Sequence, residues 1–136
     1  MSKSIVIACS KDELTRIRQF VADQLDHHNI PDLQAHKLVL AVDEVCANLI
    51  IHANYCDPTN KIELDLQFNP KQIIFTFRDK GDRFDINQYD SPSMDELVSS
   101  RRQGGLGLLL VKRIMDKIEF STEKNYNICT LVKTIG

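Results

Sequence analysis

KIELDLQFNPKQIIFTFRD, residues 61–79, decides the fold of this 136-residue chain. Its first eight residues alternate strictly between apolar and polar side chains, which is typical of a strand that buries one face. NPKQ at 69–72 makes a tight connection, and the apolar run at 73–79 returns along the first strand. The stretch therefore predicts a β-hairpin whose apolar face must be covered by other parts of the chain.

Helical and β-rich patterns surround this hairpin. Apolar residues recur with helical spacing upstream of it, and Ser10 with Glu13 has the spacing of a capping box at a helix start. The expected elements besides the hairpin are a strand at 4–9, helices at 10–28 and about 32–54, a helix from the glycines near 105 to about 116, and strands at 117–124 and 127–135.

This order of elements predicts the fold class. Most strands follow one another as hairpin partners, and a few helices must cover one face of the sheet they form. We expect an α+β two-layer sandwich, with a mainly antiparallel mixed sheet and helices on one face. A polar segment at 80–104, with a short helix expected at 93–100, is long enough to indicate a functional or mobile loop.

Composition indicates one globular domain over residues 1–136. The net charge of −2 argues against general electrostatic binding to nucleic acid or to an anionic membrane. No apolar run approaches the roughly 20 residues that span a bilayer, and the N-terminal sequence predicts no export signal. Without an export signal, we expect a cytoplasmic protein with reduced thiols, and the lack of a C-x-x-C pair argues against a metal site built from the cysteines. The cysteines are Cys9, Cys46, Cys56 and Cys129.

Glu44 and Asn48 stand four residues apart on the second expected helix, beside its apolar stripe. Polar groups at the margin of a core must find partners, and two interpretations stay open. One is an intrahelical hydrogen bond, or a contact between Glu44 and a nearby cation. The other is the floor of a cleft, where the Asn48 carbonyl is a ligand for Mg²⁺ and the Glu44 carboxylate takes a proton.

Asp79 ends a predicted strand, and Gly81 follows two residues later. An ordinary Asp-x-Gly turn explains this pattern. The alternative is a buried carboxylate that accepts a hydrogen bond from an exocyclic amine, with Gly81 letting a planar base approach the backbone. A carboxylate only accepts hydrogen bonds, so it suits the amino group of adenine.

RRQGGLGLLL, residues 101–110, places glycines directly before an apolar helix. A flexible linker into the helix is one interpretation. The other is a phosphate cradle, because free N–H groups at a helix N-terminus favour anions. The stretch is not a P-loop, since it lacks G-x-x-x-x-G-K-[ST]. A polar loop precedes the glycines, which also disfavours a dinucleotide-binding βαβ unit.

Together these motifs resemble the GHKL (Bergerat-fold) ATP-binding domain, and within it the bacterial anti-sigma-factor serine/threonine kinases. LAVDEVCANLIIHAN (40–54) is similar to their N-box, FRDKGDRFD (77–85) to their G1 box, and GGLGLLLVKRIMDKIEF (104–120) to their G2 box. Arg83 stands where larger GHKL families have a second G1-box glycine.

The resemblance implies a role for each matching residue. Asn48 would coordinate the Mg²⁺ that bridges the phosphates of ATP, and Glu44 would act as base or orient the acceptor hydroxyl. Asp79 would accept a hydrogen bond from the adenine amino group. The other implied nucleotide contacts are Gly81 and Thr130 near adenine, Gly104, Gly105 and Gly107 around phosphate, and Arg102, beside Gln103, near the terminal phosphate.

The implied activity is transfer of the γ-phosphoryl group of ATP to a Ser or Thr of an anti-anti-sigma (STAS-type) protein. By the same resemblance, an RNA polymerase sigma factor is the other partner, and we expect a homodimer that forms through the sheet edge near residues 4–9. The alternative is a nucleotide-sensing module that binds partners without kinase activity. The presence of Glu44 favours the kinase, because a binding module needs no base.

Overall fold

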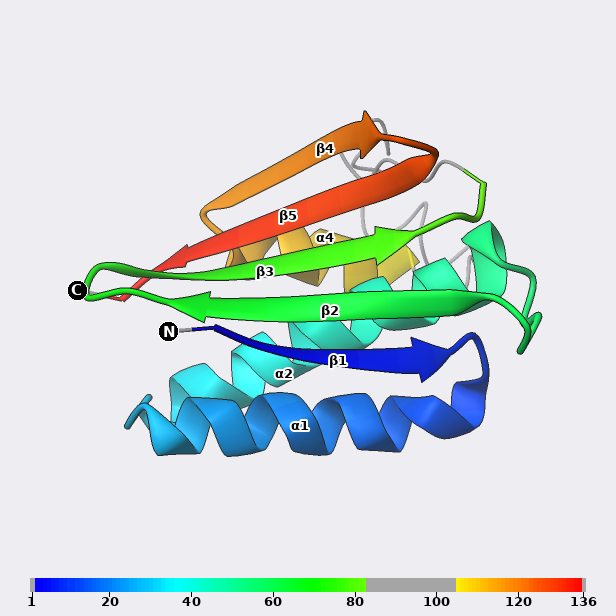
Figure 1. Ribbon diagram of the computed structural model, residues 1–136. Coiled ribbons are helices and arrows are strands. Elements are labelled where there is room, and N and C mark those ends of the chain that lie inside the picture. Colours follow the sequence, from blue (N-terminus) through cyan, green and yellow to red (C-terminus); the bar gives the residue numbers. More distant parts are fainter. Residues whose placement is uncertain (1, 83–104, 136) are drawn as a thin grey trace.

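Five strands and three α-helices form two layers in the computed structural model, which describes residues 2–82 and 105–135 (Figure 1). The expected helix at 93–100, together with Arg83, Arg102 and Gly104, lies outside the described residues. The elements are β1 (Ser2–Ala8), α1 (Leu14–His27), α2 (Asp32–Asn48), β2 (Lys61–Phe68), β3 (Gln72–Asp79), α4 (Gly105–Ile114), β4 (Lys117–Glu123) and β5 (Tyr126–Thr134), with a 3₁₀ turn at Lys11–Glu13 and a π-helical turn at Leu49–Ala53.

The sheet has the order β1-β2-β3-β5-β4, and its four described pairings are all antiparallel. The predicted hairpin forms its centre, with Leu64 opposite Phe77 and Leu66 opposite Phe75. The Asn69 side chain holds the connection, because its Oδ1 accepts bonds from the backbone N–H groups of Lys71 and Gln72 at 3.0 and 2.9 Å. The α+β two-layer fold predicted from the sequence is confirmed.

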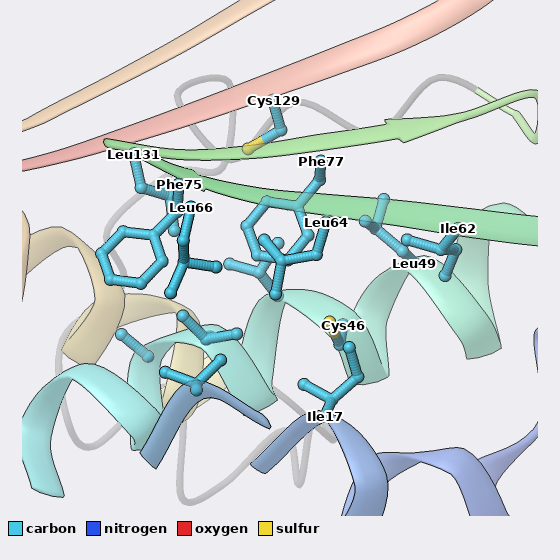
Figure 2. Close-up of a cluster of buried hydrophobic side chains, with 14 of the residues drawn as sticks. Ile17, Cys46, Leu49, Ile62, Leu64, Leu66, Phe75, Phe77, Cys129 and Leu131 are labelled. Carbon is cyan, nitrogen blue, oxygen red and sulfur yellow. The ribbon is translucent and has the colours of Figure 1, made fainter. Parts of the chain in front are cut away.

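All three helices lie on one side of the sheet, and no described element covers the other side (Figure 1). Alternate residues of the hairpin point toward the helices, as the period of two requires, and Figure 2 shows several of them meeting α1 and α2. Burying each of these side chains contributes about 1.5–3 kcal/mol. The fully buried hairpin residues are Ile62, Leu64, Leu66, Ile73, Phe75 and Phe77.

The first helix begins with only half of the expected capping box. Ser10 caps the start, but its side chain accepts from the N–H of Asp12, at 3.3 Å, within a 3₁₀ turn. The Glu13 carboxylate pairs with Arg16 at 3.2 Å instead of reaching back. Its expected donor is already used, because the Ser10 N–H donates to the Ala8 carbonyl at 2.8 Å.

The second helix ends earlier than expected, at Asn48 rather than near residue 54. The next five residues form a wider π-helical turn, in which the N–H of Asn54 donates to the carbonyl of Leu49 at 3.0 Å. Tyr55 and Cys56 then take positive φ angles, which stop the helix. No helix in the described part of the chain is long and apolar enough to cross a membrane.

We expect Phe75→Ala to lower the free energy of unfolding by about 3–5 kcal/mol, because it leaves a cavity under the middle of the sheet. Thr76→Ala is the control, since Thr76 is only half-buried and points to the uncovered face. Urea denaturation of both variants measures the difference. Equal losses in the two variants would contradict the assignment of the buried face.

Candidate functional site

Three segments that are distant in the sequence meet at one end of the two-layer fold. α2 carries Glu44 and Asn48 near its C-terminus, and β3 ends at Asp79. α4 packs against α2 and begins on the side where α2 and β3 end (Figure 1). The fold therefore brings the end of α2, the end of β3 and the start of α4 into one region of the molecule.

Asn48 is a buried amide with a defined orientation. Its side chain is 4% exposed, and its Nδ2 donates to the backbone carbonyl of Glu44 at 2.7 Å. An intrahelical bond therefore forms, but it uses the Glu44 backbone and not its carboxylate. Because only the amide nitrogen can donate, this bond identifies the oxygen, Oδ1, as the end available to a ligand.

The Glu44 carboxylate is half-buried beside Asn48. Burial raises its pKa above the ordinary glutamate value, and the nearby Asp43 carboxylate raises it further. Asp43 is itself held by Arg18 of α1 at 2.9 Å. Glu44 makes no ion pair with any residue in 2–82 or 105–135, so the raised proton affinity is not offset by a cation there.

Asp79 is the most deeply buried carboxylate of the described residues, at 2% exposure. Its Oδ2 accepts two hydrogen bonds of 3.0 Å, from Asn54 Nδ2 and from the Gly81 N–H. Burial raises the pKa of Asp79, while these two bonds act in the opposite direction. Both donors bind the same oxygen, so Oδ1 receives no hydrogen bond from the described residues and can accept one from a ligand.

Gly81 is required by the chain's own packing. A Cβ at this position would stand 2.5 Å from the Ala53 carbonyl oxygen and 2.5 Å from Asn54 Oδ1. The neighbouring Asp82 N–H donates to the Ala53 carbonyl at 2.8 Å, which joins the segment after β3 to the π-helical turn. The glycine therefore allows this close approach, and the bond from its N–H to Asp79 also makes the ordinary Asp-x-Gly turn.

The structure does not bring Thr130 to Asp79. Thr130 alternates with the buried Cys129 and Leu131 on β5 and pairs with Thr76, so it lies on the uncovered face of the sheet. The β5 residue opposite Asp79 is Asn127. Its Nδ2 donates to the Gly81 carbonyl at 2.6 Å, so Asn127 occupies the position expected for Thr130.

The glycine segment is described from Gly105 onward. Gly105 and Gly107 are the first and third residues of α4, which places the unpaired N–H groups of a helix start at this point of the chain. Lys112 and Arg113 stand in the last turn, where cations complement the helix dipole.

Asn54 and Asn127 are site residues that the motifs did not reveal. Asn54 is 1% exposed, and its Nδ2 bonds both Leu49 O, at 2.8 Å, and Asp79 Oδ2. No spacing rule places Asn54, because the π-helical turn shifts it inward. Asn127 had a signal: it shares the β5 face of Cys129 and Leu131, which the alternation of that strand could have identified.

A family model described as the histidine kinase-like ATPase domain matches residues 7–133. The chain belongs to this family, and the resemblance to GHKL domains is confirmed.

The particular relatives are kinases by name. Two curated proteins, each called serine-protein kinase RsbW, are similar to this chain. The protein from Bacillus licheniformis is 27% identical over 95 residues, which is 67% of this chain and 59% of the relative. The protein from Staphylococcus aureus (strain bovine RF122) is 33% identical over 98 residues, 65% of this chain and 59% of the relative. The matches thus span about three fifths of each relative's length.

A solved structure agrees with the fold. The crystal structure of the RsbU and RsbW domains of Rv1364c from Mycobacterium tuberculosis aligns with a TM-score of 0.64 at 11% identity. The match covers 100% of this chain and 33% of that one.

Asn54→Ala tests how Asp79 is held. The raised pKa of Asp79 means that the fold loses stability as the pH rises through that pKa and the buried carboxylate becomes charged. Removing the Asn54 donor raises the pKa further. We expect a loss of about 1–3 kcal/mol in the free energy of unfolding at pH 7, and a smaller loss as the pH falls toward the pKa of Asp79. Urea denaturation across this pH range measures it.

The control is Asn54→Ala in an Asp79→Asn background, where position 79 has no carboxylate to titrate. There the cost of Asn54→Ala should not depend on pH in this range. A pH-dependent cost in both backgrounds would show that another group responds to Asn54.

Proposed function

We propose that this chain binds ATP with Mg²⁺ and transfers the γ-phosphoryl group to a Ser or Thr of a small regulatory protein. The observation that carries the proposal is the buried Asp79 carboxylate: its two donors among the described residues both bind Oδ2, so none of those residues uses Oδ1. Membership of the histidine kinase-like ATPase family and the kinase names of the relatives support the same conclusion.

Adenine would bind at the end of β3. A buried acceptor suits an amino group, and adenine presents one where guanine presents a carbonyl. Asn54 and Gly81 hold Asp79 in one orientation, and Asn127 holds Gly81 through its carbonyl. A base that forms its hydrogen bond here therefore meets a prearranged acceptor, which lowers the cost of ordering on binding.

The phosphates would lie between α2 and the start of α4. In the described part of the chain no three His, Cys, Asp or Glu side chains gather as metal ligands. Mg²⁺ fits such a site, because it often takes one or two protein oxygens and completes its shell with phosphate and water. When bound, the ion neutralises charge that develops on the phosphates. Asn48 Oδ1 would be its protein ligand, and the N–H groups at Gly105 and Gly107 would face phosphate.

Glu44 would accept the proton of the acceptor hydroxyl or orient that hydroxyl for attack. It lies one helical turn before Asn48, so both side chains stand on the same side of α2. Phosphoryl transfer depends mainly on positioning and charge stabilisation, and a half-buried carboxylate with raised pKa is suited to taking a proton.

The proposed acceptor is an anti-anti-sigma (STAS-type) protein, and the second proposed partner is an RNA polymerase sigma factor, whose binding would make the chain an anti-sigma factor in the cytoplasm. The serine-protein kinase names of the relatives support the acceptor residue type. The proposed homodimer would form along β1, because β1 is an edge strand of the sheet and an edge strand can pair with another chain. A partner-binding module without kinase activity is the second candidate, which the position of Glu44 disfavours.

Nucleotide binding should separate the two polar positions. We expect Asp79→Asn to weaken ATP binding about tenfold to a hundredfold, because the loss of one buried charged acceptor costs about 1.5–3 kcal/mol. Asn48→Ala should mainly remove the Mg²⁺-dependent part of the affinity. Isothermal titration with and without Mg²⁺ measures both effects.

The control for these variants is Asp65→Asn, the same change on a half-buried strand residue of the uncovered face. It should bind ATP as the unmodified chain does. Normal ATP affinity in Asp79→Asn would overturn the adenine assignment.

Phosphoryl transfer should depend on Glu44. With labelled ATP and a candidate STAS protein, Glu44→Gln should retain nucleotide binding and lose most of the label transferred. The rate in the unmodified chain should fall as the pH drops through the raised pKa of Glu44, at a higher pH than for an ordinary glutamate. Asp43→Asn should move this acidic limb to lower pH, because Asp43 helps to raise that pKa. Binding without any label on the partner would favour the binding module.

A further inference from the structure

An open groove lies at the opposite end of α2 and α4 from the candidate site. Residues from the start of α2 and the end of α4 form its walls, and Lys133 of β5 stands at its rim, around a volume of about 580 Å³. Leu40, the groove residue nearest to Asn48 along α2, lies about 12 Å from it at 1.5 Å per residue. On α4 the groove comes closer, because Leu110 stands one helical turn after Gly107. Its charged residues are farther away: Lys37 lies about 17 Å along α2 from Asn48, and Arg113 about 9 Å along α4 from Gly107.

Several apolar side chains that line the groove are exposed to solvent. Leu33 is 71% exposed, Leu40 43% and Leu110 37%, and all three line the same groove. Single exposed leucines are ordinary, but leucines gathered around one hollow are typical of a surface that binds another molecule.

Positive charge surrounds these leucines. Lys37, Arg113 and Lys133 line the groove, and none of its described lining residues carries a carboxylate. Lys133 is partly neutralised, because its Nζ donates to the Ile114 carbonyl at 3.0 Å and lies 3.9 Å from Asp116. Lys37 and Arg113 form no ion pair with any residue that the structure describes. In a chain of net charge −2, this is a local cationic rim around an apolar floor.

We propose that this groove docks an amphipathic helix of a partner protein, with an apolar face flanked by Asp or Glu. Two packed helices form the groove, and a third helix can lay its i, i+3, i+4 and i+7 side chains between them. Acidic flanks would meet Lys37 and Arg113 on either side. The 71% exposure of Leu33 favours a helix over a small ligand, because a molecule inside the hollow would leave that side chain in water.

A designed peptide tests the groove directly. The probe is a fluorescent 18-residue helix with leucines along one face and glutamates on both flanks, and fluorescence anisotropy measures its binding to the full chain. We expect Lys37→Glu/Arg113→Glu to weaken binding about tenfold, because the change removes two surface ion pairs and sets like charges opposite the glutamates of the probe. Leu33→Asp should weaken it by a similar factor, and amide NMR shifts should fall on α2 and α4.

Two controls isolate the charge effect. Lys71→Glu/Lys124→Glu changes the net charge equally at exposed turn residues outside the groove, and it should bind the probe normally. A peptide with lysines in place of the glutamates should bind at least tenfold more weakly than the probe. Nucleotide binding by all these variants should be unchanged, so this test is independent of the proposed kinase activity.

The following results would overturn the proposal. The first is equal binding of the acidic and basic peptides, and the second is no loss in the groove variants or no binding at all. The third is a groove that takes sodium dodecanoate while the peptide leaves its amide signals unmoved, since the surface would then bind a small amphiphile and not a helix.

Discussion

The hydrogen bonds of one buried carboxylate organise this end of the molecule. A charged group this deep is tolerated only when it is well bonded, and Asp79 obtains its donors from two different segments. Asn54 comes from the turn after α2, and Gly81 from the segment after β3. The hydrogen bonds to Asp79 Oδ2 therefore join the N-box and G1 segments. The proposed base-binding atom is the other oxygen, Oδ1, which neither donor uses.

The π-helical turn makes that junction possible. After α2, the backbone N–H of Asn54 bonds the carbonyl of Leu49, five residues back. In this turn the Asn54 side chain also reaches Asp79 at the end of β3. π-helical turns are rare and occur often at functional sites. The same turn presents the Ala53 carbonyl to Asp82, which is why residue 81 has no room for a Cβ. The π-helical turn thus determines both the position of Asn54 beside Asp79 and the need for a glycine at residue 81.

Much of the fold could be predicted from residue patterns alone. The strict alternation at 61–68 and the helical spacing in α1 and α2 identify the buried faces, because each period has a single geometric meaning. The π-helical turn could not be predicted, since a shift from i−4 to i−5 bonding leaves no periodic trace. Asn54 was missed for that reason. Thr130 was expected near adenine only because the family often has a threonine there, whereas its alternation with Cys129 assigns it to the uncovered face of the sheet.

The position of β5 has a consequence for how the molecule is made. This strand comes last among the described elements, yet it lies inside the sheet between β3 and β4 and bonds Gly81 through Asn127. A chain still emerging from the ribosome can form the β2–β3 hairpin early, but the other edge of β3 stays unpaired until β5 has been made. Until then the sheet is incomplete and Gly81 lacks its hydrogen bond from Asn127, so β5 is the strand that joins β4 to the rest of the sheet and completes the surroundings of Asp79.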